Sequence, residues 1–437
     1  MIPRQLLIIA DDVTGAADSA ARCCQAGLAA WIAIAPEAAT VSQSAMAEAD
    51  IVALSTDSRF LTPEAAVNRV QQVVRHIMTA TQSERTLAWY KKIDSTLRGN
   101  IGAELDAMLP LLTPSGLSPY AIVCPAFPAQ QRTLVDGYLC YDQLPPRTLH
   151  LPTLLAEQSR YPVAALALPT VRGGQDALCT ALQALHQQNQ TLVVIDAETE
   201  ADLAEIVAAT QGLFPHALFC GSAGLVGVLA IGMANEQGRS LPTAEDSDIN
   251  QRRTKSLATT VPFTAAGQGT SLVIVGSGST MAQQQVAYLH TITTVAVFEI
   301  DPQQSVEENL MRVVLPPAKD MDAIVLHLPK PTGDAQLEGE QAREYAELLA
   351  EVTAQIMGGI VGEMILSQLI VVGGDTAIHL FTRLEIAALQ VIDEKLPGMP
   401  QTAGVDSQGK SYEIILKAGN HGDRETLATL LNLHTPS

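Results

Sequence analysis

The sequence predicts an α/β protein with two α/β domains in series, each built on a mostly parallel sheet, and an active-site cleft between them. Three observations lead to this expectation. Short apolar runs of the buried-strand type alternate with helical periods along most of the chain. A polar stretch without a sustained period interrupts the alternation near the middle. The 437 residues also exceed the size at which one hydrophobic core keeps growing.

The first domain is expected over residues 1–235, and a linker region over residues 236–269 follows it. In the first domain, apolar runs predict strands at residues 6–10, 31–35, 51–54, 86–90, 120–124, 192–195 and 217–220. One helix is expected to end near Gly27, where glycine is a usual stop signal. Further helices are expected at residues 63–78, 101–109, 174–186 and 198–210.

The second domain is expected over residues 270–437. Its predicted strands are residues 271–275, 294–298, 323–328, 369–372, 400–404 and 412–417. Its predicted helices are residues 281–289, 338–357 and 376–386. Strands that alternate with helices in this way form parallel sheets covered by helices.

The composition limits the partners and the location. A formal net charge of −20 argues against nucleic-acid and anionic-membrane partners. The apolar run at residues 6–10 is too short for a signal peptide or a membrane span, so a cytoplasmic protein is expected. The six cysteines form no CxxC pair and the nine histidines no ligand-spaced pair, so neither a zinc centre nor a disulfide framework is expected.

The densest group of reactive side chains lies at residues 90–100, between a predicted strand and a predicted helix. Open α/β sheets present ligand-binding groups at such carboxyl ends of their strands. Either Asp94 or Ser95 is expected to cap the helix that follows. The loop therefore suits a small anion or a phosphoryl group. Its candidate substrate-binding residues are Lys91, Lys92, Asp94, Ser95 and Arg98.

Three more polar loops follow predicted strands of the first domain. Asp11 and Asp12 end the first strand; such a carboxylate orients or deprotonates an alcohol, or holds Mg²⁺ through water, although a helix N-cap explains one of the two acids. Arg59 suits a bidentate clamp on a carboxylate, or an ion pair with Asp57. The loop at residues 125–133 offers either a further anion contact or a plain rigid turn.

Glycine-rich loops follow three predicted strands of the second domain. Glycine lets the backbone approach a ligand closely, and successive N–H groups form an anion nest. Three such loops at strand ends favour a nucleotide phosphate site over chance turns. The candidate residues are Ser277, Gly278 and Ser279, then Gly373, Gly374, Asp375 and Thr376, and finally Gly419 and Asn420.

Two motif matches lead to different conclusions. Residues 404–411 satisfy the Walker A pattern, but a predicted strand follows them instead of the helix that this motif needs, so a hairpin turn is expected. The Gly276-x-Gly278 pair, with Glu299 about twenty residues later, is similar to a dinucleotide fingerprint whose third glycine is replaced by Met281. An NAD(P)-dependent oxidoreductase therefore stays as the alternative class.

Four segments resemble the four-carbon acid sugar kinases. They are residues 8–16, residues 90–102, the Gly-Gly-Asp loop at Gly373 and the Lys-Ala-Gly segment at Lys417. The segments occur in order from one end of the chain to the other, so the resemblance covers essentially the whole sequence. The first two are long and specific, and the glycine loops are weaker.

The resemblance implies an ATP-dependent kinase that phosphorylates the terminal O4 hydroxyl of a tetronate. The first domain would bind the sugar acid and the second the nucleotide. The Lys-Lys-Ile-Asp-Ser-Thr form ranks D-threonate first, ahead of D-erythronate and 3-oxo-tetronate. Mg²⁺ would come with the ATP phosphates, and its protein ligands are unknown.

By motif, the resemblance places Asp12, Arg59, Lys92, Asp94 and Ser95 against the substrate. It places Ser277, Gly373, Gly374, Asp375, Thr376 and Gly419 in the ATP site. The choice of catalytic base between Asp12 and Asp94 stays open, as does a homodimer. One departure is His421, which stands where relatives often have an aromatic residue, so the adenine contact is open as well.

Overall fold

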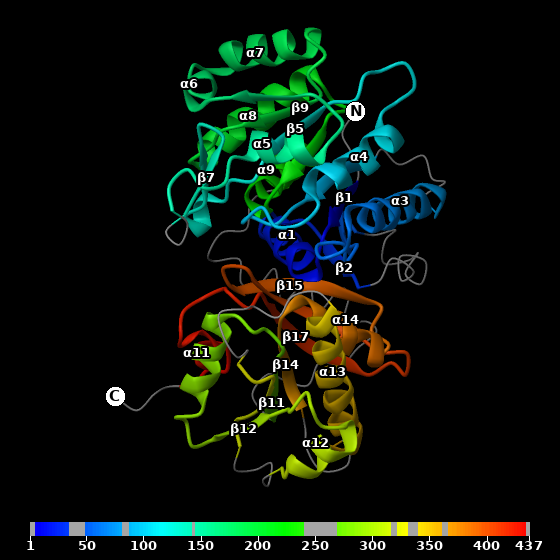
Figure 1. Cartoon of the computed structure of the whole chain (residues 1–437), viewed down its shortest axis with the longest axis vertical. Helices are drawn as coiled ribbons and strands as arrows, with labels where there is room; N and C mark the ends of the chain where they lie inside the picture. The colour runs from blue at the N-terminus through cyan, green and yellow to red at the C-terminus, as the bar shows by residue number, and fades with distance from the viewer. Residues whose placement is uncertain are drawn as a thin grey trace. The chain divides into compact units, whose positions relative to one another are not determined.

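The computed structural model describes residues 5–34, 49–80, 87–141, 145–239, 269–315, 321–330, 340–360 and 366–433. The chain divides into two units, Met1–Pro242 and Thr243–Ser437, and each is an α/β structure (Figure 1). This confirms the predicted fold class of two α/β domains in series. Most of the predicted linker region, residues 240–268, lies outside the described residues. The cleft between the domains stays a prediction.

The sheet of the first unit is parallel throughout. Its strand order is β2-β3-β1-β4-β10-β5-β9-β8, and every neighbouring pair is parallel. The chain leaves β1 for β2 and β3 on one side and later adds β4 on the other, so the order reverses at β1. The strands are β1 (Gln5–Ala10), β2 (Ala30–Ala33), β3 (Ile51–Ser55), β4 (Leu87–Lys92), β5 (Ala121–Cys124), β8 (Val163–Leu166), β9 (Leu192–Ile195) and β10 (Leu218–Gly221).

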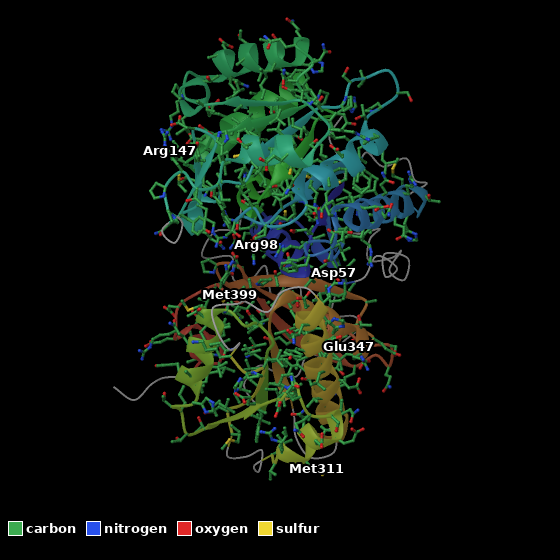
Figure 2. The ribbon with its side chains drawn as sticks, in the orientation of Figure 1. Asp57, Arg98, Arg147, Met311, Glu347 and Met399 are labelled. Atoms are coloured by element: carbon green, nitrogen blue, oxygen red, sulfur yellow. The ribbon has the colours of Figure 1, made fainter. Side chains whose placement is uncertain are left out.

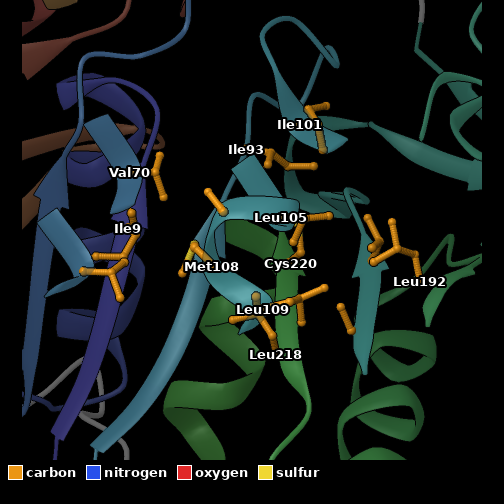
Figure 3. Close-up of a cluster of buried hydrophobic side chains, with 14 of the residues drawn as sticks. Ile9, Val70, Ile93, Ile101, Leu105, Met108, Leu109, Leu192, Leu218 and Cys220 are labelled. Atoms are coloured by element: carbon orange, nitrogen blue, oxygen red, sulfur yellow. The ribbon is translucent and has the colours of Figure 1, made fainter. Parts of the chain in front are cut away.

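Helices pack around this sheet, with α1 beside α9 and α3 beside α4. Figure 3 shows Ile9 of β1, Val70 of α3 and Leu105 and Met108 of α4 in one buried cluster. This cluster fixes the strand ends from which the site loops start. The helices are α1 (Val13–Gln25), α3 (Pro63–Ala80), α4 (Ile101–Leu112), α5 (Leu151–Gln158), α6 (Leu168–Val171), α7 (Gln175–Gln187), α8 (Glu200–Leu213) and α9 (Ala223–Glu236).

A small hairpin and several buried thiols complete the first unit. The short helix η2 (Pro128–Gln130) leads to the antiparallel strands β6 (Thr133–Val135) and β7 (Tyr138–Cys140). All six cysteines of the chain lie in this unit. Of these, Cys23, Cys124 and Cys220 are buried, and burial raises the pKa of Cys124 and Cys220 to about 12.

The sheet of the second unit has the order β12-β13-β11-β14-β17-β16-β15. Its first five strands run parallel, and β16 is antiparallel to both of its neighbours. The strands are β11 (Thr270–Val275), β12 (Val295–Glu299), β13 (Ala323–His327), β14 (Leu366–Val372), β15 (Ala388–Leu396), β16 (Met399–Val405) and β17 (Ser411–Lys417). The helices are α11 (Thr280–Leu289), α12 (Val306–Arg312), α13 (Glu340–Ile360), α14 (Gly374–Arg383) and α15 (Thr426–Leu430).

Several elements were not predicted, and each has a weak sequence signal. Strand β15 alternates buried and exposed residues and carries three charges, so it shows no continuous apolar run. Helix α9 is apolar on nearly all sides and has no helical period. Strand β8 is short and only partly buried. No helix in the described ranges is long and apolar enough to cross a membrane.

Candidate functional site

The first group of candidate residues lies where the strand order of the first unit reverses. Strand β1 pairs with both β3 and β4, with Ala10 opposite Ser55 on one side and Lys92 on the other. The loops after these three strands therefore leave the same edge of the sheet side by side. Ligands of open α/β sheets bind outside the carboxyl ends of the strands at such a switch point. We call these three loops the first loop set.

Asp12 caps helix α1, as the N-cap interpretation of the acidic pair predicts. Its Oδ1 accepts a hydrogen bond from Gly15 N at 2.7 Å. Arg59 holds both acids from the loop after β3: Nε and Nη2 bind the two carboxylate oxygens of Asp11, and Nη1 lies 2.7 Å from Asp12 Oδ2. Asp11 is nearly inaccessible, whereas Asp12 keeps 15% of its side chain exposed. Asp12 is therefore the acid that can reach a ligand.

Lys92 lies beside Asp12 at the start of α1. A Cβ atom on Gly15 would lie 2.7 Å from Asp12 Oδ1 and 2.8 Å from Lys92 Nζ, so only glycine lets these two groups approach the helix backbone here. The Lys92 ammonium donates to Ile93 O at 3.0 Å and has no carboxylate within 4 Å among the described residues. The nearby Asp12 carboxylate offsets part of this buried charge, but no direct ion pair with a described residue holds the ammonium, so it stays available to an anion.

Lys91 points the other way, because successive side chains of a strand alternate between its faces. Its Nζ lies 2.5 Å from Glu104 Oε2, and neither side chain is more than 1% exposed. The other oxygen of Glu104 accepts from Ser58 Oγ at 2.6 Å. Lys91 was predicted to contact substrate; in the structure it instead ties β4 to α4 in the interior.

Asp94 forms the centre of the loop after β4. It accepts hydrogen bonds from Arg98 Nε and Thr96 Oγ1. The sequence predicts Asp94 or Ser95 as the cap of the following helix, but neither caps it, because α4 begins after Asn100. The Asn100 side chain donates a hydrogen bond to Leu61 O at 2.8 Å instead of capping the helix. Leu97 and Gly99 adopt positive φ between Asp94 and the start of α4, so the chain is not helical directly after Asp94.

Both candidate catalytic carboxylates are held in their charged form. Burial alone would raise the pKa of Asp12, but Arg59 and Lys92 and two hydrogen bonds lower it. Burial would likewise raise the pKa of Asp94, but Arg59 and Arg98 lower it below its usual range. A strong general base has a pKa near the working pH. Both acids are thus better suited to orienting a hydroxyl and neutralising cations than to removing a proton early.

The loop after β5 brings an arginine to the same place. Arg132 Nη1 donates a short hydrogen bond to Ser95 Oγ. The sequence indicates an anion contact somewhere in residues 125–133 but does not single out this side chain. Arg98 is the most exposed cation of the group, with 45% of its side chain accessible (Figure 2).

The second group of candidate residues lies at three adjacent strand ends of the second unit. Strand β14 lies between β11 and β17, with Val372 opposite Val275 and Lys417. The three predicted glycine-rich loops follow these strands. Two of the loops lead into helices: Ser279 caps α11 by accepting from Ala282 N, and Gly373 is the N-cap of α14 without a side-chain bond. We call these loops the second loop set.

The second loop set is closely packed through its glycines. A Cβ on Gly276 would lie 1.9 Å from Thr376 Oγ1, and one on Gly419 would lie 1.8 Å from Ser277 Oγ. Gly373 N also donates to Lys417 O at 3.0 Å. Asn420 is exposed at the end of the last turn. Two helix N-termini thus start beside a turn that carries backbone N–H groups, which is an arrangement suited to phosphate.

Lys417 is the residue of this group that sequence reasoning missed as a ligand. It is fully buried, and its Nζ lies 3.0 Å from Ala418 O beneath the Gly419 turn. No carboxylate lies within ion-pair distance of it in the part of the chain that the structure describes, and burial lowers its pKa to about 7. An ammonium buried without a counter-charge is the donor that a phosphate would satisfy. The residues present therefore fit ATP.

The two motif matches are settled by the topology. Residues 404–411 join β16 to β17, which pair antiparallel with Val405 opposite Ser411, so the predicted hairpin is confirmed. Glu299 ends β12, but β13 separates β12 from β11. The dinucleotide fingerprint needs its acid on the strand next to the glycine loop. The oxidoreductase alternative therefore lacks its acidic contact. Among the described residues, no group of acids, histidines and cysteines could hold a metal ion.

Both halves of the chain match known protein families. The family model of a sugar-binding N-terminal domain matches residues 6–229, and that of a nucleotide-binding C-terminal domain matches residues 272–427. Curated relatives that span both domains are named as kinases of four-carbon sugar acids. The protein belongs to the four-carbon acid sugar kinase family and is a sugar-acid kinase, which confirms the resemblance and the enzyme class predicted from the motifs.

Three curated relatives span nearly the whole chain. A D-threonate kinase of Cupriavidus necator is 31% identical over 445 residues and aligns with 96% of each chain. A D-erythronate kinase of Heliobacterium modesticaldum is 28% identical and covers 88% of this chain and 87% of its own. A 3-oxo-tetronate kinase of Pseudomonas fluorescens is 28% identical and covers 98% and 97%. The three names differ in the acid, so they support the class and not one substrate.

Two solved structures share the fold. A Salmonella typhimurium protein superposes with a TM-score of 0.70 at 21% identity, covering 98% of both chains. A Haemophilus influenzae protein superposes with a TM-score of 0.65, also at 21% identity, covering 98% of this chain and 99% of its own. At this identity the likeness shows the fold alone.

Proposed function

We propose that the protein is an ATP-dependent kinase that phosphorylates the terminal O4 hydroxyl of a four-carbon sugar acid, with D-threonate as the first candidate. The first loop set binds the sugar acid and the second binds the triphosphate. D-Erythronate and 3-oxo-tetronate are the other candidates, because relatives named for all three acids lie at similar identity.

The observation that carries the proposal is the Lys92 ammonium next to the Asp12 carboxylate. An acceptor alcohol needs a hydrogen-bond acceptor to orient its O–H, and Asp12 supplies one with an exposed oxygen. The transferred phosphoryl group needs a cation near the acceptor, and Lys92 supplies one that forms no direct ion pair with a described carboxylate. Both groups are fixed by the backbone of α1 and β4, so they are preorganised.

The second loop set provides positive charge and N–H donors for the phosphates. Ser277, Gly373, Thr376 and Gly419 lie within one packed group, and Lys417 is beneath it. Mg²⁺ bound with the ATP phosphates would neutralise part of their charge. Among the described residues no cluster of acids could hold this ion, so the phosphates would be its main ligands.

Phosphoryl transfer depends mainly on positioning and charge neutralisation. Asp12 accepts the hydroxyl hydrogen bond and takes up the proton late, because its lowered pKa makes it a weak base. Asp94 holds Arg98 and Thr96 in place and so shapes the loop. Asp12 is the base candidate we favour, because its carboxylate lies next to Lys92 at the start of α1.

A coupled ADP-release assay with ATP·Mg²⁺ across the tetronate stereoisomers tests the proposal. We expect release with one four-carbon acid, D-threonate first, and none without an acid. Thermal-shift measurements with ATP·Mg²⁺ and with NAD(P)⁺ form the control, since a bound ligand raises the melting temperature. Stabilisation by NAD(P)⁺ alone, or no ADP release with any tetronate, would overturn it.

A further inference from the structure

Arg132 is anchored to the first loop set from a strand that is not next to β1. It precedes β6 in the loop after β5, and its backbone forms two hydrogen bonds with Phe127, of 2.7 and 3.1 Å. From there its Nη1 reaches Ser95 Oγ in the loop after β4. Strand β10 lies between β4 and β5, so this hydrogen bond joins loops that follow two non-adjacent strands. The backbone bonds of Arg132 and the hydrogen bond of its Nη1 restrict the orientation of the planar guanidinium group.

The other arginines of this site have their charge satisfied by protein. Arg59 binds Asp11 and Asp12, and Arg98 binds Asp94. These partners raise the pKa of both arginines. Arg59, the predicted clamp for the substrate carboxylate, therefore already grips two protein carboxylates.

Arg132 differs in this respect. No carboxylate lies within 4 Å of its guanidinium among the residues that the structure describes, and its Nε and Nη2 form no hydrogen bond with them. Burial lowers its pKa even though Asp94 and Asp18 lie near enough to oppose this. Two further groups affect the pKa of Arg132. Arg98 lowers it by charge repulsion, and Tyr141, whose ring lies 5.9 Å from the guanidinium carbon, raises it.

We infer that Arg132 binds the carboxylate of the sugar acid through the Nε and Nη2 edge, with Ser95 holding its third nitrogen, and that Arg59 instead positions Asp12. The inference rests on the proposed function. A guanidinium edge with two parallel N–H groups matches a carboxylate bidentately. The acid carries its carboxylate at C1 and its acceptor hydroxyl at C4. Asp12 and Arg132 come from different loops, and we assign Asp12 to the hydroxyl end and Arg132 to the carboxylate end.

The test compares a charged substrate with a neutral one. Steady-state kinetics of the wild type, Arg132→Gln and Arg132→Lys are measured with the tetronate that the wild type uses best and with its matching alditol (threitol for D-threonate, erythritol for D-erythronate), which has a hydroxymethyl group in place of the carboxylate. Loss of a charged bidentate contact should raise KM for the acid by about 10- to 100-fold. KM for ATP and turnover of the alditol should stay within about 2-fold of the wild type. The melting temperature should stay within about 2 °C. Arg132→Lys should recover part of the loss.

Arg147 provides the matched control. It is 71% exposed, and its guanidinium lies 5.5 Å from the Tyr138 ring (Figure 2). Arg147→Gln removes the same charge from the same unit and should leave both substrates unchanged. If Arg132→Gln weakens the acid and the alditol equally, or lowers kcat with KM for the acid intact, the inference is overturned. If the variant does not fold, Arg132→Lys with an unchanged KM for the acid overturns it. Absence of wild-type ADP release with every tetronate would instead sink the proposed function.

Discussion

The Lys91 ammonium lies 2.5 Å from a carboxylate oxygen of Glu104, and both side chains are out of reach of solvent. Removing one partner of a buried ion pair leaves an uncompensated charge, which typically costs about 3–5 kcal/mol. We therefore expect Lys91→Met to lower the free energy of unfolding by about 3 kcal/mol, measured by urea denaturation. Replacing Glu104 with Leu in the same chain should restore much of this loss.

Lys92→Met is the control for that prediction. This lysine forms no direct ion pair with a described carboxylate, so its loss should leave the stability within about 1 kcal/mol and lower kcat by about 10²-fold or more. Equal loss of stability in both variants would show that the two lysines do not differ in role as the structure indicates.

Asp12→Ala should lower kcat by at least ~10²-fold, the range of a lost general base. The same change removes the N-cap of α1, which costs about 1 kcal/mol of stability, and also removes the ion pair between Asp12 and Arg59. Asp12→Asn separates the two effects, because asparagine caps a helix as well as aspartate does. We expect the same loss of kcat in Asp12→Asn with a smaller loss of stability than in Asp12→Ala, because asparagine keeps the cap but not the ion pair with Arg59. Near-normal turnover in Asp12→Ala would remove the catalytic role.

Lys410→Ala should leave ATP affinity intact, although Lys410 completes the Walker A pattern. It lies in the hairpin between β16 and β17, where no helix N-terminus follows. Lys417→Met should instead weaken ATP binding by about 10-fold or more, since it removes the buried ammonium beneath the second loop set. Isothermal titration calorimetry with ATP·Mg²⁺ measures both. A large loss in Lys410→Ala alone would revive the Walker interpretation.

ATP binding should take up protons above neutral pH. Burial lowers the pKa of Lys417 to about 7, so above this pH the ammonium is mostly neutral without ligand. A bound triphosphate favours the charged form, so the affinity should fall as the pH rises from 7 to 9. Titrations in buffers with different ionisation enthalpies count the protons. Lys417→Met should abolish the uptake, and the same uptake in that variant would contradict the assignment.

The stability of the chain should depend on pH through the same lysine. In the unfolded chain its pKa returns to 10.5, so between pH 7 and 10.5 the unfolded state binds more protons than the folded one. The contribution of Lys417 to the free energy of unfolding therefore rises with pH across this window. Below pH 7 the folded wild type buries a charged ammonium, and Lys417→Met removes that cost. The gain in stability of Lys417→Met over the wild type should therefore be largest below pH 7. Urea denaturation at pH 6.5 and 9 measures the difference, and a constant difference would contradict it.

The positions of the site loops were predictable because buried strands leave clear apolar runs. The loops that follow β1, β3, β11, β14 and β17 start within one residue of the predicted positions, whereas β4 runs two residues further than predicted and includes Lys91 and Lys92. The hairpin at residues 404–411 was likewise predictable, since its flanking runs have strand periodicity. Local patterns thus located both loop sets.

The partners of individual charges were not predictable. Ser95 and Arg132 are 37 residues apart, and their contact depends on β10 lying between β4 and β5. Glu104 reaches Lys91 only because α4 packs on that face of the sheet. One signal was available: neighbouring lysines at a strand end must point to opposite faces, so Lys91 and Lys92 could not both line one site.

The distribution of cysteines provides an internal reporter for one half of the chain. All six lie in the first unit, and the thiols of Cys23, Cys124 and Cys220 are buried there. The thiolate is the form that reacts with alkylating reagents, and burial both blocks access and keeps these thiols protonated. These sites are therefore protected until that half opens. A pulse of iodoacetamide during denaturation would therefore time the opening of one half, while the other, which has no sulfhydryl, adds no mass. Compared with the unfolding transition of the whole chain, this alkylation would show whether the first half opens before, with or after the rest.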